Sequence, residues 1–142
     1  MGGFAGVRMS GISKSFGGNY ANRDVDFAVA PGEIVGLLGE NGAGKTTLMN
    51  VLYGLYHPEA GHITLGDQTI RMDSPRDAIR HGIGMVHQHF MLVQNQSVAE
   101  NVALGYEKAP FFFPRRVVSE KLKEFGKIFG LQVDPNAMVW QL

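Results

Sequence analysis

The feature that most constrains this chain is a glycine-rich run that joins an apolar segment to an amphipathic one. The run reads Gly39-Glu40-Asn41-Gly42-Ala43-Gly44-Lys45-Thr46-Thr47 and fits the pattern G-x-x-x-x-G-K-[ST]. Its glycines allow the backbone to curl so that successive N–H groups point inward, where side chains would block a phosphate. A following helix adds the partial positive charge of its N-terminus. The sequence therefore predicts a binding site for a nucleoside triphosphate at residues 39–47.

Backbone and side chains of this run are expected to bind different parts of the ligand. Lys45 is expected to reach the β and γ phosphates, and the Thr46 hydroxyl is expected to ligate Mg²⁺. The three glycines supply the curvature. The other residues of the predicted site are Glu40, Asn41, Ala43 and Thr47.

Both flanks of the run have the pattern that such a loop requires. Glu33–Leu38 is almost continuously apolar, which is typical of a central strand covered on both faces. From Lys45 to Leu55 the apolar residues recur at the spacing of one helix face. Strand, loop and helix are therefore predicted to be contiguous, which is the context in which this motif binds phosphate.

The remaining segments predict an α/β chain. Alternating apolar residues predict antiparallel strands at residues 7–12 and 23–29, and a hairpin at 63–65 and 69–72. The run Gly82–Val86 predicts a second buried strand. Helices are predicted after Ser74-Pro75, after Ser97 with Glu100 at capping-box spacing, and over residues 118–129.

Composition excludes several function classes. Thirteen Lys and Arg balance thirteen Asp and Glu, which argues against a nucleic-acid partner held by non-specific charge. The chain has no Cys, so disulfides and thiolate metal sites are excluded. Its apolar runs are shorter than the roughly 18 residues that indicate a membrane span. A length of 142 residues corresponds to one ordinary domain.

Beyond the phosphate loop, the order of several motifs resembles the nucleotide-binding domain of ATP-binding-cassette (ABC) transporters. The resemblance implies an α/β P-loop NTPase fold that is incomplete: an antiparallel β subsheet, part of the parallel core sheet and the start of the helical subdomain. It implies a nucleotide-binding core at residues 1–88 and a Q-loop region with a partial helical subdomain at 89–142. The motifs are Ser13-Lys14-Ser15-Phe16-Gly17-Gly18, Val25–Val29, Pro31-Gly32-Glu33, Tyr53-Gly54-Leu55, Pro58–Gly61 and Met85–Phe90.

The resemblance adds two residues to the predicted site. Phe16 falls where the family has an aromatic ring that stacks on adenine. The alternative is a core residue at a strand end, and Tyr20 is the weaker candidate for the stacking ring. Gln88 matches the glutamine of the family's Q-loop, whose amide oxygen ligates Mg²⁺ or holds the attacking water; the alternative is an ordinary glutamine at a strand end. The expected cofactors are ATP and Mg²⁺.

The segments His89–Val93 and Ser97–Val102 are most similar to importer ATPases for simple sugars or nucleosides. That resemblance implies a second ABC cassette and transmembrane permease subunits as partners, and a peripheral location on the cytoplasmic face of the cell membrane. A soluble ABC protein that acts on ribosomes or DNA is the alternative from another class. The balanced charge argues against it.

Three family features do not occur in this sequence: the LSGGQ-like signature, an apolar strand ending in Asp followed by the catalytic Glu, and the switch His. The chain therefore resembles the first half of a cassette. We expect the parent protein to hydrolyse ATP coupled to solute import and the 142-residue chain to be inactive alone, so that it only binds nucleotide. In the family, further strands lie between segments 33–38 and 82–86 in the parallel sheet. The resemblance therefore implies that these two strands lack neighbours here, and we also expect self-association.

Overall fold

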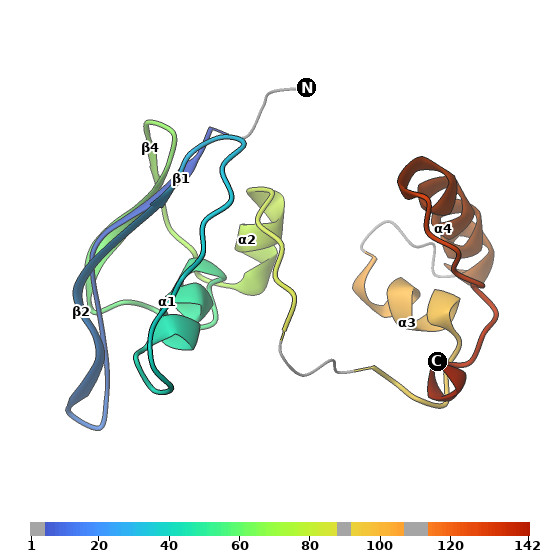
Figure 1. Cartoon of the computed structure of the whole chain (residues 1–142), viewed down its shortest axis with the longest axis horizontal. Coiled ribbons are helices and arrows are strands. Elements are labelled where there is room, and N and C mark those ends of the chain that lie inside the picture. The colour runs from blue at the N-terminus through green and yellow to red at the C-terminus, as the bar shows by residue number, and fades with distance from the viewer. Residues whose placement is uncertain (1–4, 88–91, 107–113) are drawn as a thin grey trace. The chain divides into compact units, whose positions relative to one another are not determined.

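A computed structural model of the chain describes residues 5–87, 92–106 and 114–142. It divides into two compact units, Met1–Val86 and His87–Leu142 (Figure 1). The phosphate-loop sequence lies in the first unit. Each unit is described by itself below.

The first unit contains an antiparallel sheet with the strand order β2-β1-β3-β4. Two glycines with positive φ, Gly17 and Gly18, form the turn between the first two strands, a conformation that favours glycine. The two predicted antiparallel strands and the second hairpin are confirmed, and the first two strands extend further toward this turn than predicted. The strands are β1 (Val7–Phe16), β2 (Asn19–Val29), β3 (Ala60–Leu65) and β4 (Gln68–Ile70).

Two short helices lie on the same side of this sheet, α1 (Lys45–Leu52) and α2 (Pro75–Arg80) (Figure 1). The core forms where the sheet meets them; it consists of Val7, Met9, Ile12, Leu48, Val51, Ile63, Met72 and Ala78, all buried. Helix α2 begins as predicted, because the Ser74 hydroxyl accepts a hydrogen bond from the Asp77 N–H. Helix α1 ends at Leu52 with Tyr53 as its C-cap, just ahead of Gly54, the glycine at which the sequence allows this helix to stop and which adopts a positive φ of 76°.

Two sequence predictions about central strands are wrong within the described residues. Neither Glu33–Leu38 nor Gly82–Val86 forms a strand, and Ile34 is 99% exposed where burial was predicted. A strand exists only through a hydrogen-bonded ladder with a neighbour. An apolar run therefore becomes a strand only when another strand pairs with it, and no described strand pairs with either segment.

The second unit is built around α3 (Val98–Gly105) and α4 (Pro114–Phe129), with a short 3₁₀ turn at Val139–Gln141. The predicted capping box is confirmed: the Ser97 hydroxyl accepts from the Glu100 N–H, and Glu100 accepts from the Ser97 N–H. Ala99, Val118 and Val139 are buried in this unit. The predicted helix over residues 118–129 is also confirmed as part of α4.

Candidate functional site

The phosphate-loop sequence runs directly into α1. Gly42 and Gly44 have φ values of 86° and 83°, so both occupy the left-handed region that favours glycine. Gly44 is the N-cap residue of α1, and no side chain caps this end of the helix. The first N–H groups of a helix have no partner within it. The loop therefore presents backbone donors and a helix N-terminus together, which suits an anionic ligand.

Lys45 folds back over the loop that precedes it. Its Nζ donates to the Gly39 carbonyl at 2.7 Å and to the Glu40 carbonyl at 2.8 Å. The Ala43 N–H also donates to the Glu40 carbonyl, at 3.1 Å. The ammonium group thus lies at the mouth of the loop and holds it curled. Phosphate oxygens make stronger hydrogen bonds with an ammonium group than neutral carbonyls do.

The other predicted residues of the loop differ in accessibility. Glu40, Asn41 and Thr46 are exposed, and Thr47 is half-buried. Thr46 lies in the first turn of α1, where its hydroxyl can reach solvent. Gln88, the second predicted Mg²⁺ ligand, lies outside the described residues. Among the described side chains no cluster of His, Asp and Glu could hold a metal ion by itself.

One residue of the loop's surroundings was missed by the sequence analysis. Asn22 on β2 is only 6% exposed, and its Nδ2 donates to the Gly44 carbonyl at 3.2 Å. The backbone of β2 also approaches Gly44 so closely that a Cβ there would lie 2.2 Å from the Ala21 carbonyl oxygen. The one signal in the sequence is an Asn at the edge of a strand pattern, since Asn is depleted in strands.

Phe16 lies at the end of β1 and is 46% exposed. Its ring makes an edge-to-face contact with Tyr56 at 5.1 Å between ring centroids, and the Lys14 Nζ lies 5.4 Å from the Phe16 centroid. Tyr20, across the same hairpin, is 52% exposed and has the Arg23 guanidinium 4.3 Å from its centroid. Neither ring belongs to the buried core. Phe16 and Tyr20 are therefore both accessible to a nucleotide base.

A carboxylate stabilises the strand that carries Phe16. Glu59 accepts hydrogen bonds from the Ser15 N–H at 3.0 Å and from the Lys14 Nζ at 3.3 Å. The backbone hydrogen bond from Ser15 is the main cause that lowers the pKa of Glu59 below its ordinary value of 4.5, and Lys14 acts in the same direction. Glu59 is therefore ionised at neutral pH and fixes the end of β1.

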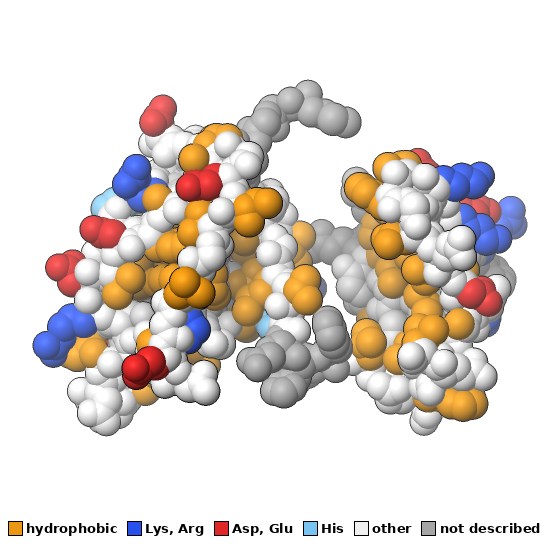
Figure 2. All heavy atoms as spheres, in the orientation of Figure 1, with side chains coloured by type: hydrophobic (Ala, Val, Ile, Leu, Met, Phe, Trp, Pro, Cys, Tyr) orange, Lys and Arg blue, Asp and Glu red, His pale blue; other side chains and the backbone are white. Residues whose placement is uncertain are grey.

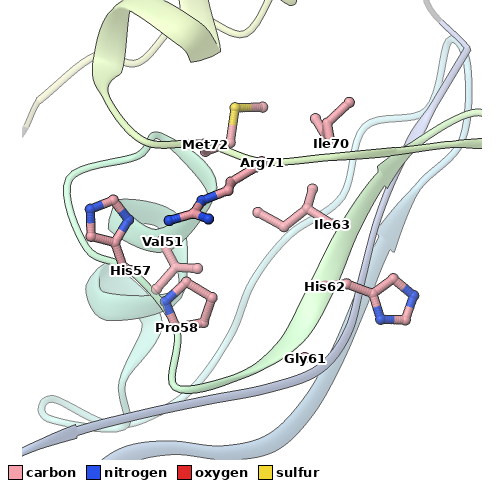
Figure 3. Close-up of a pocket in the computed structure, with 9 residues that line it drawn as sticks. All are labelled: Val51, His57, Pro58, Gly61, His62, Ile63, Ile70, Arg71 and Met72. Atoms are coloured by element: carbon pink, nitrogen blue, oxygen red, sulfur yellow. The ribbon is translucent and has the colours of Figure 1, made fainter.

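A cavity of about 290 Å³ lies elsewhere in the first unit (Figure 3). It is bordered by the end of α1, the segment before β3 and the strands β3 and β4; its lining residues are Val51, His57, Pro58, Gly61, His62, Ile63, Ile70, Arg71 and Met72. No residue of the phosphate loop lines it. We assign the candidate site to the loop, because phosphate recognition depends on convergent N–H donors and not on an enclosed volume.

Residues 22–139 match the ABC transporter family. The chain belongs to that family. A glucose import ATP-binding protein of Haloferax volcanii is 44% identical over 96% of the chain. A guanosine import ATP-binding protein of Bacillus subtilis is 47% identical over 92%, and a ribose import ATP-binding protein of Rhizobium meliloti is 42% identical over 96%. The chain spans only 30%, 26% and 27% of these relatives.

Solved structures share the fold. A nucleotide-free ATP-binding cassette from an ABC transporter matches 96% of this ABC chain with a TM-score of 0.76 and 25% identity, and the match covers 58% of that cassette. A second cassette matches the whole chain with a TM-score of 0.79 and 22% identity. The predicted fold class, an α/β cassette of which this chain forms part, is confirmed. In the part of the chain that the structure describes, no helix has the length and apolar character needed to cross a bilayer.

Proposed function

We propose that this chain is the ATP-binding part of an ABC importer ATPase and that residues 39–47 bind the triphosphate. The observation that carries the proposal is the junction of loop and helix: Gly44 caps α1 without a side-chain cap, and Lys45 Nζ lies across the loop on the carbonyls of Gly39 and Glu40. An ATP phosphate would draw Lys45 from these neutral carbonyls to its own charged oxygens. The relatives named above as import ATP-binding proteins support the same assignment.

The remaining parts of the nucleotide are assigned to residues around this loop. Mg²⁺ would be held by the Thr46 hydroxyl, in the first turn of α1 and exposed, together with Gln88. Mg²⁺ supplies neutralisation of phosphate charge. Phe16 would stack on the adenine base, for which its exposed ring offers a face. Residues 1–88 would form the nucleotide-binding core, and residues 89–142 would form the Q-loop region and part of the helical subdomain.

The activity of the parent protein extends this proposal. Because the relatives are named for glucose, guanosine and ribose import, we assign the parent protein to ATP hydrolysis coupled to the import of a sugar or nucleoside. Its partners would be a second cassette and permease subunits, which would hold it at the cytoplasmic face of the membrane. The 142-residue chain contains no match to the signature or catalytic Glu of the family, so we expect it to bind ATP without sustained hydrolysis.

Titration calorimetry of the 142-residue chain with MgATP tests the assignment of the loop. We expect binding, and we expect Lys45→Met to weaken it at least about tenfold, since a hydrogen bond to a charged group contributes about 1.5–3 kcal/mol. Lys123→Met is the matched control, because Lys123 is an exposed lysine of α4 in the other unit. Equal affinity of the Lys45 and Lys123 variants would contradict the assignment. Steady ATP turnover by the purified chain would contradict its expected inactivity.

We also propose that copies of this chain associate with one another, and the exposed apolar side chains of the first unit support this proposal. Ile34 and Leu38 are 99% and 92% exposed, and Val86 is 82% exposed. Figure 2 shows hydrophobic side chains gathered on the viewed face of the first unit. Exposed apolar runs with unpaired backbone are templates for pairing with another chain. We expect light scattering to detect dimers or larger species, and the double variant Ile34→Glu with Leu38→Glu to reduce them.

The control for that experiment is Leu104→Glu, which places the same charge on a leucine that is 69% exposed in the other unit. It should leave the association unchanged. A monodisperse monomer of the unchanged chain at micromolar concentration would overturn the self-association proposal without affecting the assignment of the phosphate loop.

A further inference from the structure

A buried side-chain amide connects the antiparallel sheet to the phosphate loop. Asn22 projects from β2, and its Nδ2 donates to the carbonyl of Gly44, 22 positions further along the chain. The same carbonyl accepts the Leu48 N–H at 2.9 Å, the first hydrogen bond of α1. Asn22 therefore binds the residue at which the loop ends and the helix begins.

The backbone around this contact leaves little freedom. Gly44 is in the left-handed conformation with a φ of 83°, and a Cβ at this position would lie 2.2 Å from the Ala21 carbonyl oxygen and 2.7 Å from Asn22 Nδ2. In this way β2 lies directly against the last glycine of the loop. The segment before the loop offers no comparable support, because Glu33–Leu38 forms no strand in the described structure and all of its residues are exposed.

Burial of the Asn22 side chain lowers the stability of the fold, and an apolar residue at this position would avoid that penalty. Its Oδ1 is buried and accepts no hydrogen bond from the described residues. A buried, unpaired amide oxygen costs about 1–3 kcal/mol, and an apolar residue of similar shape would avoid that cost. Leucine has nearly the same shape as asparagine and suits a strand facing the core better. The presence of an amide at this buried position thus points to the contact with Gly44 as its role.

We propose that Asn22 is a positioning residue for triphosphate binding. It holds the Gly44 carbonyl against β2, which fixes the first turn of α1 and the direction of the N–H groups that precede and follow Gly44. Because β2 pairs with β1, whose last residue is Phe16, the contact also ties the phosphate-binding loop to the hairpin that carries the ring for the base. Asn22 itself touches no substrate atom in this scheme. The inference rests on the proposed function, since it concerns the same site.

The test compares MgATP and adenosine as ligands of the full 142-residue chain and of Asn22→Leu. The hydrogen bond to Gly44 is worth about three- to tenfold in affinity, so we expect MgATP to bind about three- to tenfold more weakly to Asn22→Leu. Adenosine has no phosphates, so its affinity should not change. The melting temperature should stay the same or rise, because the variant removes an unpaired buried oxygen. A purely structural role would instead lower the melting temperature and leave the ratio of the two affinities unchanged.

Asn95→Leu is the control, since Asn95 is exposed and lies in the other unit; it should alter neither affinity. If Asn22→Leu does not melt cooperatively, Asn22→Ser replaces it, because serine is polar but too short to reach Gly44. We expect Asn22→Ser likewise to weaken MgATP binding relative to adenosine binding. Unchanged MgATP affinity in a folded Asn22 variant would overturn the positioning role alone. Failure of the unchanged chain to bind MgATP would overturn the proposed function, and the positioning role with it.

Discussion

Replacement of Gly44 by alanine should destabilise this chain strongly, for two separable reasons. The first is backbone strain, because an L-residue in the left-handed region costs about 1–2 kcal/mol. The second is collision: the new Cβ would lie 2.2 Å from the Ala21 carbonyl oxygen, roughly 1 Å short of ordinary van der Waals contact. Since the obstacle is the backbone of a paired strand, relief requires movement of β2, and overpacking of this kind costs about 1–3 kcal/mol.

Gly42→Ala separates the two effects. Gly42 has nearly the same φ, 86°, but a Cβ there would meet nothing within 4 Å. The free energy of unfolding of Gly42→Ala should therefore fall only by the cost of backbone strain, about 1–2 kcal/mol. The free energy of unfolding of Gly44→Ala should fall by about 1–3 kcal/mol more than that of Gly42→Ala. For a chain of this size this corresponds to a melting temperature about 4–12 °C lower than that of Gly42→Ala.

Thermal denaturation followed by circular dichroism measures the difference, with both variants at the same protein concentration. The reasoning is refuted if the two variants melt at the same temperature, because the close approach of β2 to Gly44 would then carry no energetic weight. A lower melting temperature for Gly42→Ala than for Gly44→Ala would refute it as well.

Three further predictions concern other parts of the chain. Phe16→Ala should weaken ATP binding by about 1–3 kcal/mol and leave pyrophosphate binding unchanged, as measured by calorimetry; equal loss for both ligands would contradict stacking on the base. Because Ser15 lowers the pKa of Glu59 from 4.5, Glu59 contributes stability that is present above pH 4.5 and is lost as the pH falls through the lowered pKa. The melting temperature of Glu59→Gln should accordingly lie below that of the unchanged chain at neutral pH, and the two melting temperatures should converge in acid; a constant difference at all pH values would contradict this role of Glu59. Ser97→Ala should lower the unfolding free energy by about 1 kcal/mol in urea denaturation, since it removes half of the capping box with Glu100; no change would show that the cap is dispensable.

The sequence alone predicted the features that depend on local pattern. The phosphate loop follows from the residue types between Gly39 and Thr47, because its glycines and lysine are needed at fixed spacing along one short segment. The capping box of Ser97 and Glu100 follows from a spacing of three residues, and the antiparallel hairpins follow from alternation interrupted by turn residues. Each of these depends on neighbours within a few positions, so a single sequence suffices to find them.

Tertiary structure decided whatever depends on partners that are distant along the chain. Glu33–Leu38 has the composition of a buried strand, yet it forms none in the described structure, because a strand requires a ladder with another strand. The contact between Asn22 and Gly44 could not be predicted either, since no local periodicity relates residues 22 positions apart. A motif in the sequence thus predicted where phosphate binds, whereas only the tertiary structure revealed that β2 packs against Gly44 at the end of that loop.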